Sequence, residues 1–473
     1  MVDAHTKVRV RFAPSPTGHL HVGGLRTALF NFLFARHMGG TFLIRVEDTD
    51  IERSKPEYVQ SQLASLEWCG IVSDEPLVFQ SQRFSVYSAL AQQLLAEKKI
   101  YRCRCSSDEV ESRLKQSGIT DPFFGYDGHC RDKQYDESKP FALRFLVSDT
   151  FESIVVQDLI LGELVFTKSQ LDDFIIVRSD GSPTYNFAVV VDDMFMGITH
   201  VIRAQEHIPN TPKQILLYRA CGSSFEPQFA HIPLILGTDG QKLSKRDGAV
   251  DVLAYKKLGY LPQALVNYMV RLGWAHGDQE VFTLEQLVAS FTLEAVGKKP
   301  AIFDSKKLEW MNTVYLKQLS TKACYEWLVS DVGLSLSDFS SWSVDQVETA
   351  LSLYKERVVT GAELISAVRC LCQGPDHYDQ EAIAQCVNSE VLLILESLVR
   401  EWQTMALFDH MALAECIKQF CVQHSIKMPV IAQPIRIALA GKPTGAGLFD
   451  MLAVVGKTES SARVMRFVTS VRA

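Results

Sequence analysis

The stretch PSPTGHLHVGG, residues 14–24, holds residues well suited to phosphate chemistry. Its glycines allow a ligand to approach backbone N–H groups, and the imidazoles of His19 and His21 can donate hydrogen bonds. A P-loop would require Lys and then Ser or Thr after its second glycine, but Gly24 and Leu25 occupy those positions. The dinucleotide pattern G-x-G-x-x-G is absent from the same turn. The stretch favours nucleotidyl transfer, because an imidazole and a helix N-terminus can stabilise negative charge at an α-phosphate.

The segments on either side of this loop predict a βαβ unit. Residues 7–12, KVRVRF, alternate cationic and apolar side chains as a strand does, and apolar residues then recur at helical spacing as far as Gly39–Gly40. Residues 41–48, TFLIRVED, begin a second strand, which a right-handed crossover makes parallel to the first. Ligands bind beyond the carboxyl ends of such strands, where residues 11–24 would lie. The same crevice would receive three carboxylates, those of Glu47, Asp48 and Asp50.

Composition indicates a globular chain with no sign of export. The 473 residues are 47% hydrophobic and 22% charged, which suits roughly two to four domains. No segment resembles a signal peptide or a membrane span, so we expect a cytoplasmic protein without a membrane partner. The 11 cysteines predict thiols or metal ligands rather than disulfides. The net charge of −7 disfavours nucleic acid, but residues 430–473 hold a cationic cluster: Arg436, Lys442, Lys457, Arg463, Arg466 and Arg472.

Two motifs resemble the signatures of one enzyme family. RFAPSPTGHLHVGG, residues 11–24, resembles the first signature of class I aminoacyl-tRNA synthetases, in the form that glutamyl-tRNA synthetases carry. KLSKR, residues 242–246, resembles the second, and the intervening DGSPTYNFAVVVDD and THVIRAQEH are similar to the same family's core. The resemblance to bacterial glutamyl-tRNA synthetases runs across roughly the whole chain, including the C-terminal GLFDMLAVVGK.

The resemblance implies roles for individual residues. The catalytic residues would be His21, Lys242 and Lys245. Glutamate would be bound by Arg11, Ala13, Ser15, Glu47, Tyr185 and Arg203. ATP would be bound by His21, Gly23, Gly24, Glu206, His207 and Lys245. The resemblance does not single out His19, so a surface role is equally open for it.

These residue types suit glutamate, whose two carboxylates need cations and whose ammonium needs an anion. Arg11 and Arg203 are the candidate cations, because a guanidinium can bind a carboxylate in bidentate geometry, and Glu47 would face the α-ammonium. Roles without any part in substrate binding stay open for these residues. Arg203 could instead form a structural ion pair with Asp192 or Asp193, and the lysines of KLSKR could be a solvated charge run.

Three cysteines form a candidate zinc site. Cys103, Cys105 and Cys130 have the C-x-C…C arrangement of a structural knuckle, which zinc-binding members of the family carry at this place. Asp132 is the expected fourth ligand, at the position where some members have His, and Tyr126 is the alternative, with His129 also near enough in sequence. Three buried thiols without zinc are the other interpretation. Another C-x-C pair, Cys370 and Cys372, lies in a helical-looking segment without further ligands, which favours packing.

The expected fold is α/β: a split, doubly wound parallel sheet (Rossmann-like) with an insertion, followed by all-α domains. The catalytic domain would comprise residues 1–105 and 190–255, and residues 106–189 would form an inserted acceptor-end-binding domain with the zinc knuckle. The resemblance implies a helical stem-contact domain for residues 256–325 and a helical anticodon-binding region for residues 326–473. The cationic cluster there is consistent with phosphate contacts, and a solvated basic face is the alternative.

The resemblance implies glutamate–tRNA ligation. ATP, accompanied by Mg²⁺, and L-glutamate would form glutamyl-adenylate when tRNA is present, and the glutamyl group would pass to the 3′ end of tRNA(Glu). We expect a monomer. The alternatives are charging of tRNA(Gln) as well, glutamylation of queuosine in a tRNA, and an inactive tRNA-binding paralogue.

Overall fold

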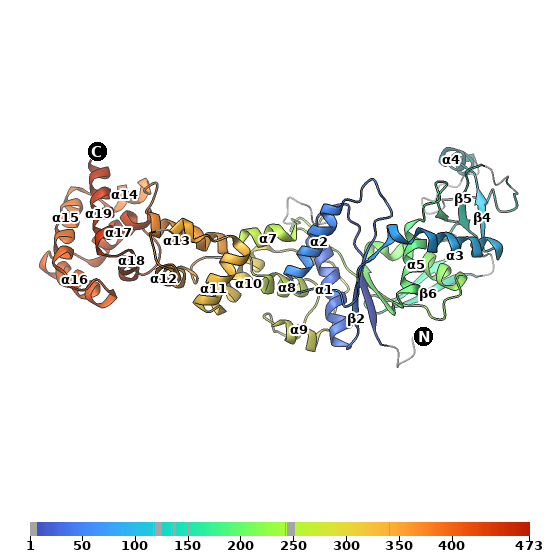
Figure 1. Ribbon diagram of the computed structural model, residues 1–473, viewed down its shortest axis with the longest axis horizontal. Coiled ribbons are helices and arrows are strands. Elements are labelled where there is room, and N and C mark those ends of the chain that lie inside the picture. Colours follow the sequence, from blue (N-terminus) through green and yellow to red (C-terminus); the bar gives the residue numbers. More distant parts are fainter. Residues whose placement is uncertain are drawn as a thin grey trace. The chain divides into compact units, whose positions relative to one another are not determined.

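The computed structural model describes residues 7–116, 118, 125–133, 135, 139–148, 151–241, 243, 251–339 and 341–473. The chain divides into two compact units, one of residues 1–253 with 266–305 and the other of residues 254–265 with 306–473 (Figure 1). No single helix in the described ranges is long and apolar enough to cross a membrane. The helices α14 (Gln380–Cys386) and α15 (Ser389–Thr404) pass this test only as a pair, with a bend of 92° between them.

The first unit is built on parallel strands. β1 (Arg9–Phe12) pairs with β2 (Thr41–Val46), and β2 pairs with β3 (Val78–Phe79). β9 (His200–Ala204) pairs with β10 (Gln228–Ile232), and the N–H of Thr199 donates to the carbonyl of Arg9 at 2.9 Å, next to β1. α1 (Val22–His37) connects β1 to β2, so the βαβ prediction is confirmed. The two pairings come from distant parts of the sequence, which confirms the split, doubly wound sheet.

Helices and one further pair of parallel strands accompany these strands in the first unit. They are α2 (Pro56–Trp68), α3 (Phe84–Ala96), α5 (Tyr185–Phe195), α6 (Thr211–Ala220), α9 (Leu284–Ser290), and β11 (Ile235–Leu236) with β12 (Ala301–Ile302). α1 is buried along most of its length, because apolar side chains on all sides of it contact other elements. α5 crosses residues 189 and 190, where the sequence predicted a domain boundary.

Antiparallel strands lie between the two halves of the parallel sheet in sequence. β4 (Ile100–Cys103), β5 (Ala142–Phe145) and β8 (Ile175–Val177) form one sheet, and α4 (Ser107–Gln116) follows β4. β6 (Ser153–Asp158) and β7 (Gly162–Thr167) form a hairpin. Exposed and buried residues alternate along β6, which gives this strand one face packed on the core.

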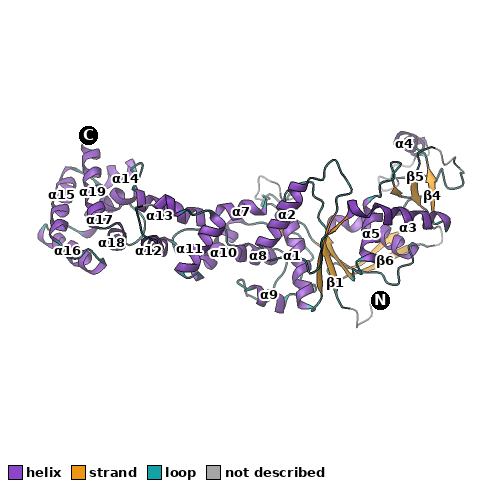
Figure 2. Cartoon of the chain, in the orientation of Figure 1, coloured by secondary structure: helices purple, strands orange, loops and turns teal. Residues whose placement is uncertain are grey.

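The chain passes between the units within three helices, which are α7 (Val252–Leu258), α8 (Pro262–Arg271) and α10 (Ser305–Gln318). After residue 305 the described elements are all helical, and Figure 2 shows only helices and loops there. They include α10 (Ser305–Gln318), α11 (Thr321–Trp327), α12 (Val344–Tyr354), α13 (Gly361–Gln373), α14 (Gln380–Cys386), α15 (Ser389–Thr404), α16 (His410–Gln423), α17 (Met428–Ala440), α18 (Leu448–Val455) and α19 (Lys457–Arg472). The predicted all-α C-terminal part is confirmed.

Arg463 on α19 departs from the predicted role of the cationic cluster. Only 1% of it is exposed, and its guanidinium donates to the carbonyls of Leu371, Cys372 and Leu439, near the ends of α13 and α17. Cations stabilise helix C-termini because the last carbonyls lack partners within the helix. The interpretation of Arg463 as a phosphate contact is therefore wrong: burial removes it from any nucleic-acid surface.

Other members of the cluster also have partners within the second unit. Arg466 donates to Glu459, Arg472 donates to Glu396, and Lys457 donates to the carbonyl of Met405. Because these contacts occupy three of the cations, the cluster is not simply a free basic face.

Candidate active site

A cavity of about 750 Å³ lies beyond the carboxyl end of β1. It is lined by every predicted glutamate or ATP residue within the described ranges: Arg11, Ala13, Ser15, His21, Gly23, Gly24, Glu47, Tyr185, Arg203, Glu206 and His207. Lys242 and Lys245 lie outside the described residues, although Leu243 between them also lines the cavity. Tertiary structure thus brings together residues that lie almost 200 positions apart in the sequence.

The N-terminus of α1 forms one wall of the cavity. His21 is the N-cap residue, and its Nδ1 accepts the N–H of Gly24 at 3.1 Å. In a neutral imidazole this arrangement leaves the proton on Nε2, which makes that atom a hydrogen-bond donor. A Cβ at Gly23 would lie 3.1 Å from the His21 ring, and one at Gly24 would lie 2.8 Å from Leu20. The glycines therefore allow the ring and the first helical turn to approach each other closely.

The loop before α1 is held by α2. Gln62, almost fully buried, donates from Nε2 to the carbonyls of Ser15 and Gly18 at 3.2 and 2.7 Å. Gln62 was not predicted from the sequence, because a glutamine on an amphipathic helix ordinarily indicates the solvent-exposed face of that helix. His19 turns to the same helix, with Nδ1 2.8 Å from the hydroxyl of Ser61.

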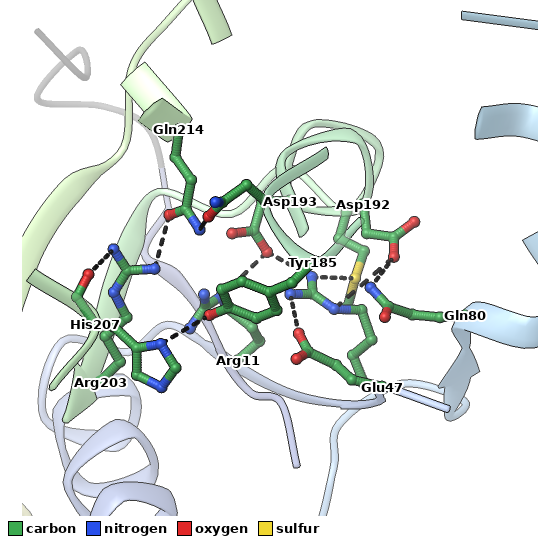
Figure 3. A network of polar contacts seen from close by, with 12 residues as sticks. Arg11, Glu47, Gln80, Tyr185, Asp192, Asp193, Arg203, His207 and Gln214 are labelled. Atoms are coloured by element: carbon green, nitrogen blue, oxygen red, sulfur yellow. Dashed lines mark hydrogen bonds and ion pairs between the residues drawn. The ribbon is translucent and has the colours of Figure 1, made fainter. Parts of the chain in front are cut away.

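An ion-pair network lies below the cavity between β1, β2 and α5 (Figure 3). Arg11 Nε donates to Asp193 Oδ1 at 3.1 Å, and Arg45 forms ion pairs with both Asp193 and Glu47. Asp192 accepts from Gln80, Arg83 and Tyr87. Nearly all of these side chains are buried, so each charge requires its partners. Arg45 was also missed, although a cation in the otherwise apolar strand TFLIRV is a signal for a buried ion pair.

Glu47 reaches the cavity from the end of β2. Its Oε1 lies 3.1 Å from Arg45 Nη2. Burial raises the pKa of Glu47, and this effect outweighs the opposing attraction of Arg45 and Arg11. Two other carboxylates expected in the crevice are elsewhere: Asp48 accepts from Ser81 and Asp50 from Arg53, and neither lines the cavity. The prediction that the crevice receives all three carboxylates is correct only for Glu47.

Arg203 is buried at the opposite side of the cavity, with 4% of its surface exposed. It donates to Gln214 Oε1 at 2.7 Å (Figure 3). It also donates to Thr211 Oγ1 at 2.9 Å and to His231 Nε2 at 3.2 Å. Among the described residues no carboxylate forms an ion pair with Arg203, so the alternative of a structural pair with Asp192 or Asp193 is wrong. Those two aspartates are occupied by other arginines. Arg203 thus brings a buried positive charge to the cavity wall with neutral partners only.

Tyr185 and the short helix η3 (Gln205–Asn210) complete this wall. The hydroxyl of Tyr185 lies 3.2 Å from His207 Nδ1. Burial, assisted by nearby Arg203, lowers the pKa of His207 to about 4, so this imidazole is neutral near pH 7. Glu206 is exposed at the mouth of the same wall.

The cysteine cluster lies at the end of β4 and in the loops beyond it, and none of its three residues lines the cavity. The thiols of Cys103, Cys105 and Cys130 all lie within 4.8 Å of one another. The hydroxyl of Tyr126 is 3.4 Å from Cys103 Sγ and 3.8 Å from Cys105 Sγ. Asp132 is exposed and does not belong to this described group, so the structure brings Tyr126, rather than Asp132, to the thiols. Cys370 and Cys372 lie on α13 without such a group around them in the described ranges, as predicted.

Comparison with known proteins agrees with this arrangement. Residues 7–310 match the family model described as "tRNA synthetases class I (E and Q), catalytic domain", and residues 320–468 match the model "Anticodon binding domain". The glutamate–tRNA ligase of Geobacter sulfurreducens is 45% identical over 464 residues, which cover 98% of each chain. That of Thermodesulfovibrio yellowstonii is 42% identical, with 98% of this chain and 99% of the relative covered.

A solved structure has the same fold. The glutamate tRNA ligase of Elizabethkingia meningosepticum, determined in complex with its amino acid, superposes with a TM-score of 0.87 at 30% identity, and the match covers 98% of this chain and 100% of the other. Family models, full-length relatives and fold agree with the glycine-flanked histidine and the arginine-bearing cavity. The chain therefore belongs to the glutamate–tRNA ligases, class I aminoacyl-tRNA synthetases that join glutamate to tRNA with ATP.

Proposed function

We propose that the cavity binds L-glutamate between Arg11, Arg203 and Glu47 and activates it with ATP. A glutamate carboxylate oxygen attacks the α-phosphorus of ATP, pyrophosphate leaves with Mg²⁺, and a hydroxyl of the terminal adenosine of tRNA(Glu) then displaces AMP. His21, Lys242 and Lys245 stabilise charge on the phosphates, while Gly23, Gly24, Glu206 and His207 receive ATP. The observation that carries the proposal is the buried charge of Arg203, which lacks a carboxylate partner among the described residues and lines the cavity.

The matching test is charging of purified tRNA with labelled glutamate. We expect the protein to charge tRNA(Glu), with activation dependent on tRNA in an ATP–pyrophosphate exchange assay. Charging of both tRNAs would make the protein a non-discriminating ligase. Failure to charge either, with ATP, Mg²⁺ and glutamate supplied, would contradict the proposal.

The surrounding parts of the chain have proposed roles in tRNA binding. We assign the acceptor end to residues 106–189, the stem to residues 256–325 and the anticodon to residues 326–473. The match of residues 320–468 to an anticodon-binding domain supports the last assignment. The protein would act as a monomer in the cytoplasm, where its tRNA and ATP are found.

The donor set of the cysteine cluster fits a structural zinc ion. Zn²⁺ takes four ligands in a tetrahedron, with Zn–S distances of about 2.3 Å, which requires sulfur atoms about 3.8 Å apart. Sγ of Cys105 and Sγ of Cys130 are 3.4 Å apart, close to this spacing. Cys103, Cys105 and Cys130 would hold the ion, and the hydroxyl of Tyr126 would be the fourth donor in place of the expected Asp132.

Metal analysis of the purified protein tests this site. We expect stoichiometric zinc, lost in Cys105→Ser because a zinc knuckle needs its thiolates, and retained in the control Cys386→Ser, whose thiol is outside the cluster. Tyr126→Phe should weaken zinc retention, whereas Asp132→Asn should not. Absence of zinc from the wild-type protein would end the proposal.

A further inference from the structure

A chain of buried polar contacts leads from the β6–β7 hairpin to Arg203. It begins at Asp158, the last residue of β6, which is 5% exposed, and passes through His231 of β10, which is 0% exposed. Asp158 Oδ2 lies 2.7 Å from His231 Nδ1, and His231 Nε2 lies 3.2 Å from Arg203 Nε. Among the described residues that the resemblance implies, only Arg203 takes part in this chain.

The chemistry of the three groups determines the direction of each hydrogen bond. The Asp158 carboxylate accepts backbone N–H groups from Ile160, Leu161 and His231, and an ionised carboxylate can only accept. His231 Nδ1 must therefore carry a proton and donate it to Asp158. Arg203 has donors only, so His231 Nε2 must present its lone pair to Arg203 Nε. Both contacts are satisfied by a single tautomer of a neutral imidazole.

The direction of the pKa shifts agrees with this assignment. Burial lowers the pKa of His231, and Arg203 lowers it further, although Asp158 opposes both effects. A proton on Nε2 would place two N–H donors against each other, which costs free energy at a buried site. The hydroxyl of Thr211, 3.2 Å from Nε2 and 2.9 Å from Arg203 Nη2, can satisfy both neighbours in the same tautomer.

We propose that Asp158 and His231 are positioning residues for glutamate: Asp158 holds the His231 tautomer that orients the Arg203 guanidinium at the cavity wall. Neither residue needs to touch the substrate. This positioning role depends on the proposed binding of glutamate by Arg203. The β6–β7 hairpin would thereby influence the affinity for glutamate, because Asp158, where the chain of polar contacts begins, belongs to β6.

The variant Asp158→Asn tests this role with little change of shape. The amide oxygen can still accept the backbone N–H groups, but its NH₂ would face His231 Nδ1 and favour the opposite tautomer. We expect the KM for glutamate in steady-state aminoacylation to rise about tenfold, as for the loss of one hydrogen bond to a charged group. The KM for ATP and the kcat should stay within about twofold of the wild-type values. Asp180→Asn, at an exposed turn, is the matched control.

Two further comparisons separate positioning from a general structural effect. Asp158→Asn should add no further increase in glutamate KM to Arg203→Ala, because both changes act through the same guanidinium. His231→Gln, which keeps an acceptor near the position of Nε2, should behave nearly as wild type, whereas His231→Leu should resemble Asp158→Asn. If Asp158→Asn did not fold, a near-wild-type glutamate KM in His231→Gln and a raised one in His231→Leu would still test the positioning role.

The outcomes distinguish the two layers of the proposal. If Arg203→Ala leaves the glutamate KM unchanged, the proposed role of Arg203 in binding fails. If Arg203→Ala raises this KM while Asp158→Asn and His231→Leu do not, only the positioning role is overturned. Equal changes in the KM values for glutamate and ATP, or a full additional effect in the double variant, would likewise overturn it.

Discussion

Replacing His21 by alanine is expected to lower kcat for aminoacylation by about 100-fold, because one donor to the developing negative charge is lost. The N-cap contact with Gly24 leaves Nε2 as the donor atom of the neutral ring, and the ring lines the cavity. The measurement is steady-state charging of tRNA(Glu), together with tRNA-dependent ATP–pyrophosphate exchange to isolate the activation step. The KM for glutamate should change little, since the arginines and Glu47 would bind the amino acid.

Loss of the N-cap requires its own control, because removing a capping acceptor alone costs about 1 kcal/mol of stability. His21→Asn keeps a side-chain oxygen that can accept the N–H of Gly24 but removes the imidazole donor. We expect His21→Asn to be as inactive as His21→Ala and close to wild type in thermal unfolding. His19→Ala, in the same loop but with its ring on Ser61 of α2, should retain activity. Substantial activity in His21→Asn would reduce His21 to a helix cap.

Replacing Arg203 by alanine should raise the KM for glutamate by at least about tenfold and up to about 100-fold. This range corresponds to roughly 1.5–3 kcal/mol for a hydrogen bond to a charged group. Arg203 is buried, and its described contacts are neutral, so a substrate carboxylate would supply the missing anion. The expected effect lies in glutamate binding and should leave the KM for ATP nearly unchanged.

Two variants make this measurement specific. Arg203→Lys keeps the charge but loses the planar donor group, so it should fall between alanine and wild type. Arg219→Ala removes an exposed arginine that pairs with Glu226 on the surface and should leave glutamate saturation unchanged. Wild-type saturation in Arg203→Ala would remove Arg203 from the pocket.

Local patterns in the sequence were sufficient for most of the architecture. The alternation in KVRVRF and the apolar spacing that follows predicted β1, α1 and the parallel β2, since these periods are set by backbone geometry alone. The helical C-terminal part was implied by the family resemblance, and the structure confirms it. The candidate cavity residues came from motif resemblance, and all those within the described ranges line one cavity.

The predictions that were wrong or incomplete concern contacts between side chains that are distant in the sequence. Asp193 lies closer in sequence to Arg203, yet it pairs with Arg11 and Arg45, which precede it by well over a hundred residues. Arg463 has the sequence appearance of a surface cation and is instead buried against helix C-termini. Nothing in the local sequence distinguishes these alternatives, because the residue is an arginine whether its guanidinium donates to water or to a buried carbonyl.

The sequence by itself thus determined the first βαβ unit, the glycine-flanked histidine at a helix N-terminus and the family. Only the tertiary structure decided which buried cation has no carboxylate partner among the described residues, which donor lies beside the thiols and which tautomer His231 must adopt. The physical reason is that periodicity and short motifs are properties of neighbours along the chain. Burial and hydrogen-bond pairing depend on which distant segments the fold places in contact, and at a buried site they decide the chemistry of every charged group.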